Sequence, residues 1–594
     1  AFWNCPGESM LASKDLNRQP VRSISVPNRY RKHKSVDVED RNPRSSPYDE
    51  VENMVYKEKV AEHPESPVNR PRARNLEGKH RTHVQIMSRT LLQAITDDQR
   101  NMAFSQAQQM LDHKIETLHD IEISEGIVSS LCLQLGYVLN KGNSYVQDIV
   151  TIFSLLSLVY QCSDKSKAKS FQQAGEDLFR MIEIAFDNIR DTEYFDWCTY
   201  HIMRVVRALS RVKEASIAMV RQEEMLNIIR IIILDTDSNL GAKLDAVATL
   251  KNITYYAEDH RLKILHHPGL IDALIRTCTV HGDEMGKEFA SAVIRNLAMA
   301  QNTKIPMVEH SCLLDVLVEL TDDPDLKTRR NAISAIGSLA IADENSIAFV
   351  THGEGIILQI MRRLVEEEED AIIRRRAARA LRCFGRKETV EMIVDCKDIV
   401  NSLCKVAMQD KSIEAQIEAI EALACYISHA HEMTSYYKKM LDAMVNIANS
   451  SPPLSCLVTL VKTMNTLSCF DRHQKPMTDH PELLQTVCQI AKKSKATVTC
   501  LEQAASVFYN LSCDEESREK ITTPQILEVL VSIGSKDDAD AILANAFAVR
   551  TLVNLAKFED NRIVMAQENG LLKCLIQFAS TSQDSTTKDE VKAT

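Results

Sequence analysis

A four-residue pattern, apolar at its first and last positions, recurs every 41 to 45 residues along most of this 594-residue chain. We call each copy an anchor; it ends a stretch whose apolar residues have helical spacing. A fixed period of this length is typical of helical repeat proteins, in which each unit packs only on its neighbours. The sequence therefore predicts an all-α solenoid. The nine anchors begin at Val206, Leu250, Ile294, Ile336, Leu381, Leu423, Met464, Phe508 and Leu552.

Length and composition agree with a repeat architecture. A single core stops growing at about 250–300 residues, a limit that stacked units avoid. Aromatic residues make up only 5% of the chain, with 16 glycines and 16 prolines, and the most common apolar residues favour helices. Because the uncharged apolar runs are shorter than the roughly 20 residues that a spanning helix needs, we expect no transmembrane segment.

The 16 cysteines and 17 histidines show no spacing typical of a metal or redox site. The closest cysteines, Cys396 and Cys404, are eight residues apart, so no C-x-x-C motif occurs. We interpret the cysteines as reduced core residues of a protein that is cytoplasmic or nuclear. No phosphate-binding loop or nucleophile motif is present, and we predict no metal, no cofactor and no enzymatic activity.

Composition divides the chain into four regions. Residues 1–83 hold eight of the 16 prolines and lack apolar periodicity, which predicts a disordered tail. Residues 84–122 are expected to form helices that cap the stack, and 123–578 to form about ten repeats. The Ser/Thr-rich segment 579–594 is expected to fray.

Glycines between apolar stretches predict sharp turns inside the units, because glycine readily adopts a left-handed backbone. Such turns are predicted at Gly269, at Gly353 and Gly355, and at Gly570. We expect a similar break at Gly126. Each unit is then a short helix, a glycine turn, a middle helix and a long third helix that ends in the anchor.

The repeated unit resembles the armadillo repeat. Its clearest copy reads R-N-A-I-S-A-I-G-S-L-A at 330–340, followed by the glycine turn at 353–355, and 546–572 contains a second. The resemblance covers about residues 120–578. It implies a right-handed superhelix of three-helix repeats, whose third helices line a concave groove for extended peptides.

In that family an asparagine on the third helix hydrogen-bonds the backbone of the bound peptide. The matching residues here occupy the third anchor position: Asn252, Asn296, Asn510 and Asn554. The alternative is that these amides bridge adjacent helices. Nuclear-import adaptors place a tryptophan one turn before the asparagine, where this chain has Ala248, Ala292, Ser506 and Arg550. The resemblance is therefore catenin-like rather than importin-alpha-like.

The face of the third helices is predicted to be basic although the repeats are acidic. Residues 1–90 carry 17 basic and 12 acidic residues, which leaves 54 basic and 70 acidic residues in the remainder. The positions one, four and eight residues before the third anchor residue lie near one side of a helix. Their acidic residues are Glu288, Glu421 and Glu502. Their basic residues are Arg204, Arg207, Lys251, Arg295, Arg330, Arg375, Arg379, Arg382, Lys462 and Arg550.

We interpret this basic face as a groove for acidic or phosphorylated peptide segments, because arginine pairs bidentately with carboxylate and phosphate. Its predicted site residues are Asn252, Asn296, Arg330, Arg375, Arg379, Arg382, Asn510, Arg550 and Asn554. The alternative is local pairing, in which the acidic run 366–370 folds back as a salt-bridged cap near Arg374. Nucleic acid is disfavoured, because the repeats are acidic and lack interleaved aromatic residues.

The leading functional prediction is a non-enzymatic adaptor or scaffold that binds proteins. Two alternatives stay open: a nuclear import adaptor, and the armadillo part of a truncated multidomain protein. In the N-terminal tail, Arg22 to Pro27 fits the pattern R-S-x-S-x-P, which is similar to sites that phosphoserine-binding adaptors recognise. Ser25 is therefore a candidate phosphosite.

Overall fold

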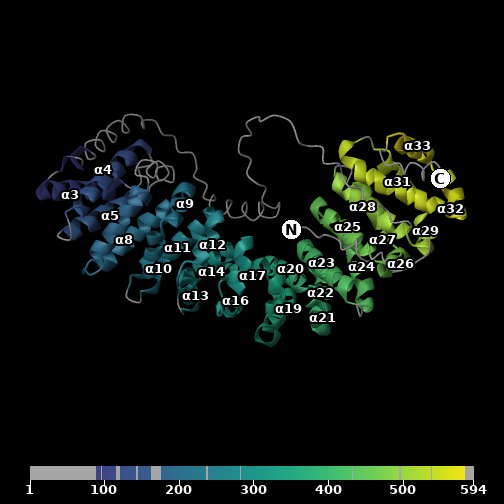
Figure 1. Ribbon diagram of the computed structural model, residues 1–594, viewed down its shortest axis with the longest axis horizontal. Coiled ribbons are helices and arrows are strands. Elements are labelled where there is room, and N and C mark those ends of the chain that lie inside the picture. Colours follow the sequence, from purple (N-terminus) through teal and green to yellow (C-terminus); the bar gives the residue numbers. More distant parts are fainter. Residues whose placement is uncertain are drawn as a thin grey trace. The chain divides into compact units, whose positions relative to one another are not determined.

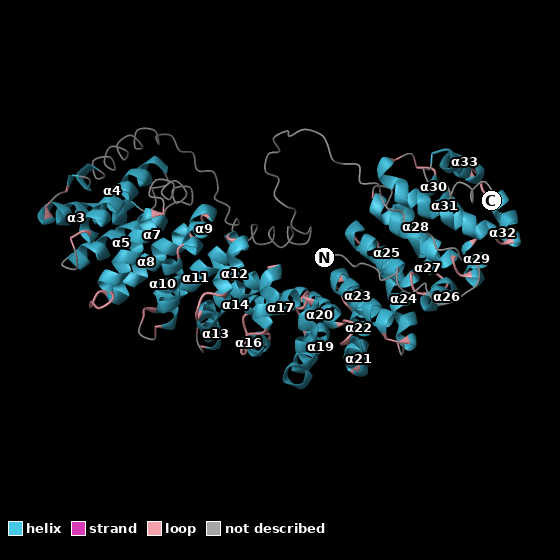
Figure 2. Ribbon diagram, in the orientation of Figure 1, coloured by secondary structure: helices cyan, strands magenta, loops and turns pink. Residues whose placement is uncertain are grey.

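The computed structural model divides into two units, Ala1–His83 and Val84–Thr594. It describes residues 89–581 apart from 92, 95, 115–120, 142–144, 162–175, 236–237, 281–282, 431–432, 494–496 and 537. The predicted N-terminal tail, with Ser25, lies outside the described residues, as does the segment after Thr581. Every regular element in the described ranges is a helix (Figures 1 and 2), which confirms the predicted all-α fold class.

Nine long helices contain the nine anchors, and each packs against the next one in chain order. We call them the third helices. The stacking of equivalent helices is the arrangement expected of a solenoid. They are α8 (Phe195–Leu209), α11 (Leu240–Tyr256), α14 (Glu284–Ala298), α17 (Leu326–Leu339), α20 (Ala371–Phe384), α23 (Ile413–His429), α25 (Leu454–Ser468), α28 (Val498–Ser512) and α31 (Ile542–Ala556).

A second row of helices packs behind the third helices. It consists of α7 (Asp177–Ile189), α10 (Glu223–Leu234), α13 (Leu270–Thr279), α16 (Leu313–Leu320), α19 (Ile356–Glu367), α22 (Lys397–Gln409), α24 (Thr434–Asn449), α27 (Leu483–Lys493), α30 (Pro524–Gly534) and α33 (Leu571–Thr581).

Short first helices connect the third helices to the second helices that follow them, except after α23. They are α9 (Lys213–Arg221), α12 (Arg261–Leu265), α15 (Lys304–Val308), α18 (Ser346–Thr351), α21 (Val390–Asp395), α26 (Asp471–Asp479), α29 (Glu515–Ile521) and α32 (Glu559–Ala566). In the described ranges four 3₁₀ turns accompany them: η2 (Glu258–His260), η3 (Gln301–Thr303), η4 (Asp343–Asn345) and η5 (His352–Gly355). A further turn, η6 (Ala539–Ala541), directly precedes α31.

The anchors form the apolar seam between the units. All eighteen of their apolar residues have an exposed fraction of 0%. Burying a side chain of this size stabilises a fold by roughly 1.5–3 kcal/mol. The anchors therefore recur because every unit must bury the same edge against its neighbours.

Two units depart from the predicted three-helix pattern. Only four residues separate the end of α23 from the start of α24, so no separate first helix lies between them. At the N-terminal end, α3 (Asp97–Lys114), α4 (Ile121–Leu139) and α5 (Val146–Gln161) precede α7, and α5 packs on α8 in the place of a third helix. The boundary expected after residue 122 falls inside α4, which begins one residue earlier.

Four of the predicted glycine turns are confirmed. Gly269, Gly353, Gly355 and Gly570 have φ values between 53° and 88°, a left-handed backbone at the entrance to the second helices. The predicted break at Gly126 is wrong, because α4 runs through it. A single glycine costs a helix only about 1 kcal/mol relative to alanine, so it does not by itself end one.

Replacing Gly355 by alanine should therefore destabilise the chain by roughly 1–2 kcal/mol, because its φ of 88° is unfavourable for a residue with a Cβ atom. Gly337→Ala is the matched control. Gly337 lies inside α17, and the nearest atom to an added Cβ is 4.0 Å away, so this change should stabilise by about 0.5–1 kcal/mol. Thermal unfolding of both variants checks the prediction, and shifts of the same sign would contradict it.

Candidate functional site

The candidate site is the face that the third helices share. We define the third-helix face by the third residue of each anchor together with the residues one, four and eight positions before it. These positions lie on one side of each helix, and the third helices pack in sequence, so the face continues from one unit to the next.

The four predicted asparagines bond to the preceding unit. In each case the side-chain Nδ2 donates to a hydroxyl oxygen at the end of the previous third helix. Asn296 is fully buried, and the other three are half-buried. The donor–acceptor distances are 2.9 Å from Asn252 to Ser210, 3.2 Å from Asn296 to Thr254, 3.0 Å from Asn510 to Ser468 and 3.1 Å from Asn554 to Ser512.

A rule in the sequence accounts for where these asparagines occur. Wherever the residue that follows an anchor is Ser or Thr, the next anchor carries an asparagine. Where that residue is Ala298, Ala340, Gly385 or Ile427, the next anchor carries Ser338, Cys383, Cys425 or Thr466 instead. The bridging alternative is thus realised at all four asparagines, and the signal for it is this pairing of anchor positions. Contact with a bound peptide stays a prediction for the same residues.

The carbonyl oxygens of two of these amides are also engaged within the chain. Arg295 donates to Asn296 Oδ1 at 3.1 Å, and Lys557 donates to Asn554 Oδ1 at 3.1 Å. Asn510 also donates to Asn465 Oδ1 at 3.1 Å, which extends the polar contact between α25 and α28. These bonds reduce the capacity of the asparagines for a ligand.

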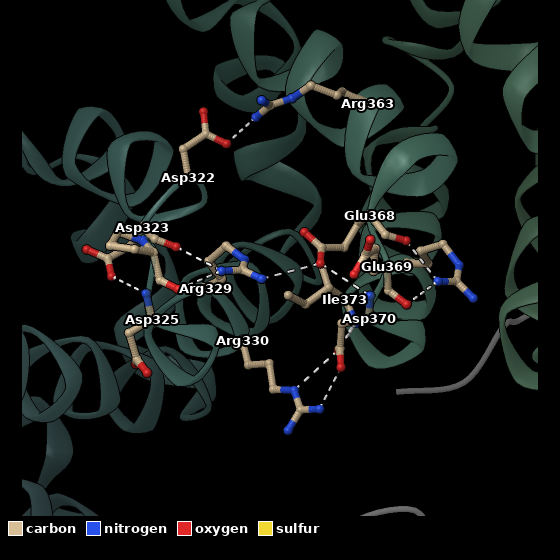
Figure 3. A network of polar contacts seen from close by, with 12 residues as sticks. Asp322, Asp323, Asp325, Arg329, Arg330, Arg363, Glu368, Glu369, Asp370 and Ile373 are labelled. Atoms are coloured by element: carbon tan, nitrogen blue, oxygen red, sulfur yellow. Dashed lines mark hydrogen bonds and ion pairs between the residues drawn. The ribbon is translucent and has the colours of Figure 1, made fainter.

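The middle units are joined by ion pairs instead. Arg330 on α17 donates to both carboxylate oxygens of Asp370, at 2.6 and 3.3 Å, just before α20 begins (Figure 3). Its neighbour Arg329 pairs with Glu368 at 3.4 Å. Glu368 and Asp370 of the acidic run therefore pair with the preceding unit, whereas Glu366 pairs with Lys405 of the next unit. The run does lie at the start of α20 near Arg374, as predicted, but Arg374 contacts it through the backbone carbonyls of Glu368 and Glu369.

Asp370 both caps α20 and holds Arg330. Its carboxylate accepts from the backbone N–H of Ile373 at 3.0 Å, in the N-cap position. Burial opposes ionisation of this carboxyl, but the hydrogen bonds from Arg330 and Ile373 outweigh it and lower its pKa below the ordinary value. The ionised form is therefore favoured, which suits a pair that joins two units.

The same arrangement recurs one unit later. Arg374 donates to Asp410 at 2.6 and 2.9 Å, and also to the backbone carbonyls of Glu368 and Glu369 at 2.8 Å. At the other end of α20, Arg382 pairs with Glu421 and, at 3.4 Å, with Glu418. Local pairing therefore occupies two predicted groove residues, Arg330 and Arg382.

Two predicted groove arginines have no such partner among the described residues. Arg375 and Arg379 lie one helical turn apart on α20, Arg375 half-buried and Arg379 exposed, and neither forms an ion pair or a side-chain hydrogen bond there. Lys462 on α25 is also exposed, with no ion pair to any residue that the structure describes. These three cations are the ones that the structure leaves available on the third-helix face.

The basic residues at the N-terminal end of the face mostly contact aromatic and polar side chains. Lys251 Nζ lies 4.3 Å from the ring centre of Phe289, and burial lowers the pKa of this lysine. Arg207 pairs with Asp245, and Arg204 donates to the hydroxyl of Tyr200 at 2.5 Å. Arg295 donates to Asn331 at 2.9 Å. At the C-terminal end of the face, Arg550 on α31 is half-buried and also has an interaction partner within the chain.

Within the described ranges, no group of three or more His, Cys, Asp or Glu side chains is placed to hold a metal ion. The fourteen cysteines described there are free, and ten of them are buried. No single helix of the described residues is long and apolar enough to cross a membrane. Two consecutive segments, Leu326–Leu339 and Asp343–Glu367, meet the length and composition criteria when they are taken together. The chain bends by 109° between them.

Comparison with known proteins shows a shared fold. No family model matches the chain, and no curated protein sequence matches it. Among solved structures, an engineered protein is 18% identical with a TM-score of 0.50, over 80% of this chain and 98% of its own. A structure from work on a phosphorylation switch that controls the interaction between cadherin and beta-catenin is 14% identical with a TM-score of 0.51, over 85% and 98%. These similarities establish the all-α solenoid fold.

If the asparagine–hydroxyl bonds join the units, Asn554→Ala and Ser512→Ala should each lower stability by about 1 kcal/mol. The double variant should lose less than the sum, because both changes remove the same bond. Urea denaturation of the four proteins gives the coupling energy. Additive losses would show that the bond contributes nothing.

The ion pairs give a second test, because Arg330 and Arg375 occupy equivalent positions on adjacent third helices. Arg330→Met should lower stability by about 1 kcal/mol, since the partly exposed Asp370 loses its partner. Arg375→Met should leave thermal unfolding unchanged, because no ion pair is lost. Equal destabilisation by the two changes would contradict the assignment.

Proposed function

We propose that this chain is a non-enzymatic scaffold whose third-helix face binds extended acidic or phosphorylated segments of partner proteins. One observation carries the proposal. On α20, Arg375 and Arg379 have no acidic partner in the described part of the chain, whereas the surrounding arginines are paired. Unpaired cations of this kind are free to bind an anion supplied by another molecule.

The geometry of α20 suits an anionic ligand. Residues four apart on a helix lie next to each other, so the two guanidinium groups can bind neighbouring carboxylates or a single phosphate. The repeats are acidic overall, with 54 basic against 70 acidic residues after position 90. The local basic site attracts acidic ligands to this part of the face. The acidic surface around it repels the same ligands elsewhere.

The comparison with solved structures supports a protein-binding role. The chain shares its fold with a structure concerned with the phosphorylation-dependent interaction of cadherin and beta-catenin. Together with the armadillo-like anchors, this favours a catenin-like scaffold. We include two further points in this proposal. The protein acts in the cytoplasm and the nucleus, and Ser25 is phosphorylated. Fold alone does not select the partner, so the site residues must be tested directly.

The test measures binding of a fluorescein-labelled 12-residue Glu/Ser peptide to the full chain by fluorescence anisotropy. Arg375→Glu/Arg379→Glu should weaken binding at least tenfold, and phosphorylating the peptide serines should strengthen binding to the unmodified protein. Lys387→Glu/Lys397→Glu is the matched control, because it changes the net charge equally at exposed positions outside the third-helix face. It should change affinity less than twofold.

Equal weakening by both double variants would show that only net charge matters, and would contradict a site on α20. Tighter binding of a Lys/Ser peptide than of the Glu/Ser peptide would favour the import-adaptor alternative. Circular dichroism spectra and melting curves of each variant verify that the fold is intact.

A further inference from the structure

A second surface stands out where α8, α11 and α14 begin. Three large apolar side chains are exposed there: Trp197 at 59%, Leu240 at 59% and Met285 at 53%. Trp197 and Met285 occupy equivalent positions, each eleven residues before the third anchor residue of its unit. Leu240 lies twelve residues before the third anchor residue of its unit, one position away from the equivalent place. Exposed apolar residues at matching places in adjacent units mark an interaction surface rather than isolated exposure.

An open pocket of about 250 Å³ lies beside Leu240. The ends of α10 and α13 and the starts of α11 and α14 line it. Its walls include Leu244 and Val247, and the exposed side chain of Val280 also lines it. Small-molecule sites are typically about 300–1,000 Å³. This pocket is therefore suited to one bulky side chain rather than to a whole cofactor.

Two aromatic residues of α8 lie beside the start of α11. A Cβ atom added to Gly241 would lie 2.7 Å from Cε2 of Tyr200, so the Tyr200 ring packs directly on the start of α11. The Tyr200 and Trp197 ring centres are 6.4 Å apart. Gly241 directly follows Leu240, so these two rings lie beside the start of the helix whose Leu240 lines the pocket.

One charged side chain at the pocket is available to a partner. The lining holds two acidic residues, Asp235 and Asp283, and two basic ones, Lys243 and Arg276. Asp235 accepts from the Ser238 hydroxyl at 2.5 Å, and Asp283 accepts from the Gly286 backbone N–H at 2.8 Å. The exposed side chain of Arg276 has no ion pair among the residues described, so its guanidinium can pair with a carboxylate of a bound segment.

We infer that this surface docks a short segment of a partner protein that carries a bulky apolar side chain close to a carboxylate. The apolar side chain enters the pocket against Leu240 and Val280, and the carboxylate pairs with Arg276. Trp197 covers the adjoining part of the segment. This site is independent of the basic residues on α20, which belong to a different unit.

The test uses Trp3→Phe, which leaves Trp197 as the single tryptophan of the full chain. A phage library of random 12-residue peptides is selected on this protein and counter-selected on its Leu240→Asp variant. Recovered peptides should share an aromatic or large aliphatic residue within three positions of Asp or Glu. They should shift Trp197 fluorescence to shorter wavelength on binding, because an exposed indole becomes covered.

Leu240→Asp should weaken these synthetic peptides at least tenfold, and Arg276→Glu should weaken the acidic peptides more than versions with the acid replaced by Gln. Leu572→Asp is the matched control, since Leu572 is 73% exposed on α33 and lies outside the surface. It should leave affinity unchanged, and so should Arg375→Glu/Arg379→Glu, which separates this inference from the proposed function.

Failure to recover peptides with the shared pattern, or equal binding to the Leu240→Asp variant, would overturn the inference. A concentration-dependent dimer in sedimentation analysis that Leu240→Asp dissociates would also overturn it, because a second copy would then be the occupant. Melting curves verify that each variant is folded.

Discussion

The structure depends on burial of the anchors between neighbouring units. Each third helix presents the same two apolar residues to the seam, and all eighteen are inaccessible to solvent. A single unit cannot bury this edge alone, so its stability comes from the units on either side. This is why the period tolerates a range of 41 to 45 residues, and why the unit at α24 can lack a separate first helix. The loops vary while the seam is preserved.

Polar contacts between units follow two different solutions. Toward both ends of the described stack, asparagine amides donate to hydroxyls, as Asn252 does to Ser210 and Asn554 to Ser512. In the middle, α17, α20 and α23 are joined by arginine–carboxylate pairs such as Arg330–Asp370 and Arg374–Asp410. The first solution is neutral and insensitive to salt, whereas the second places many charges on the units that also carry the available arginines. The proposed binding residues of α20 therefore lie next to ion pairs that join the units.

The count of basic residues on a helix face overstates the charge available to a ligand. Ten basic residues were predicted for the third-helix face, but Arg330 and Arg382 are committed to acids, and Lys251 lies over an aromatic ring. Long side chains reach acids in the next unit, about forty residues away in sequence. The useful cations are those whose neighbouring unit offers no acid within reach, as at Arg375 and Arg379.

The sequence by itself determined the repeat, the anchors, the glycine turns at the second helices and the class of side chains on the third-helix face. These features depend on local backbone preference and on a periodic need for burial, which a linear pattern records. Only the tertiary structure decided which arginines are paired, that Asp370 joins Arg330 rather than Arg374, and that Leu240 lines an open pocket. Those outcomes depend on distances between adjacent units, and the register of one unit on the next is set by packing in three dimensions.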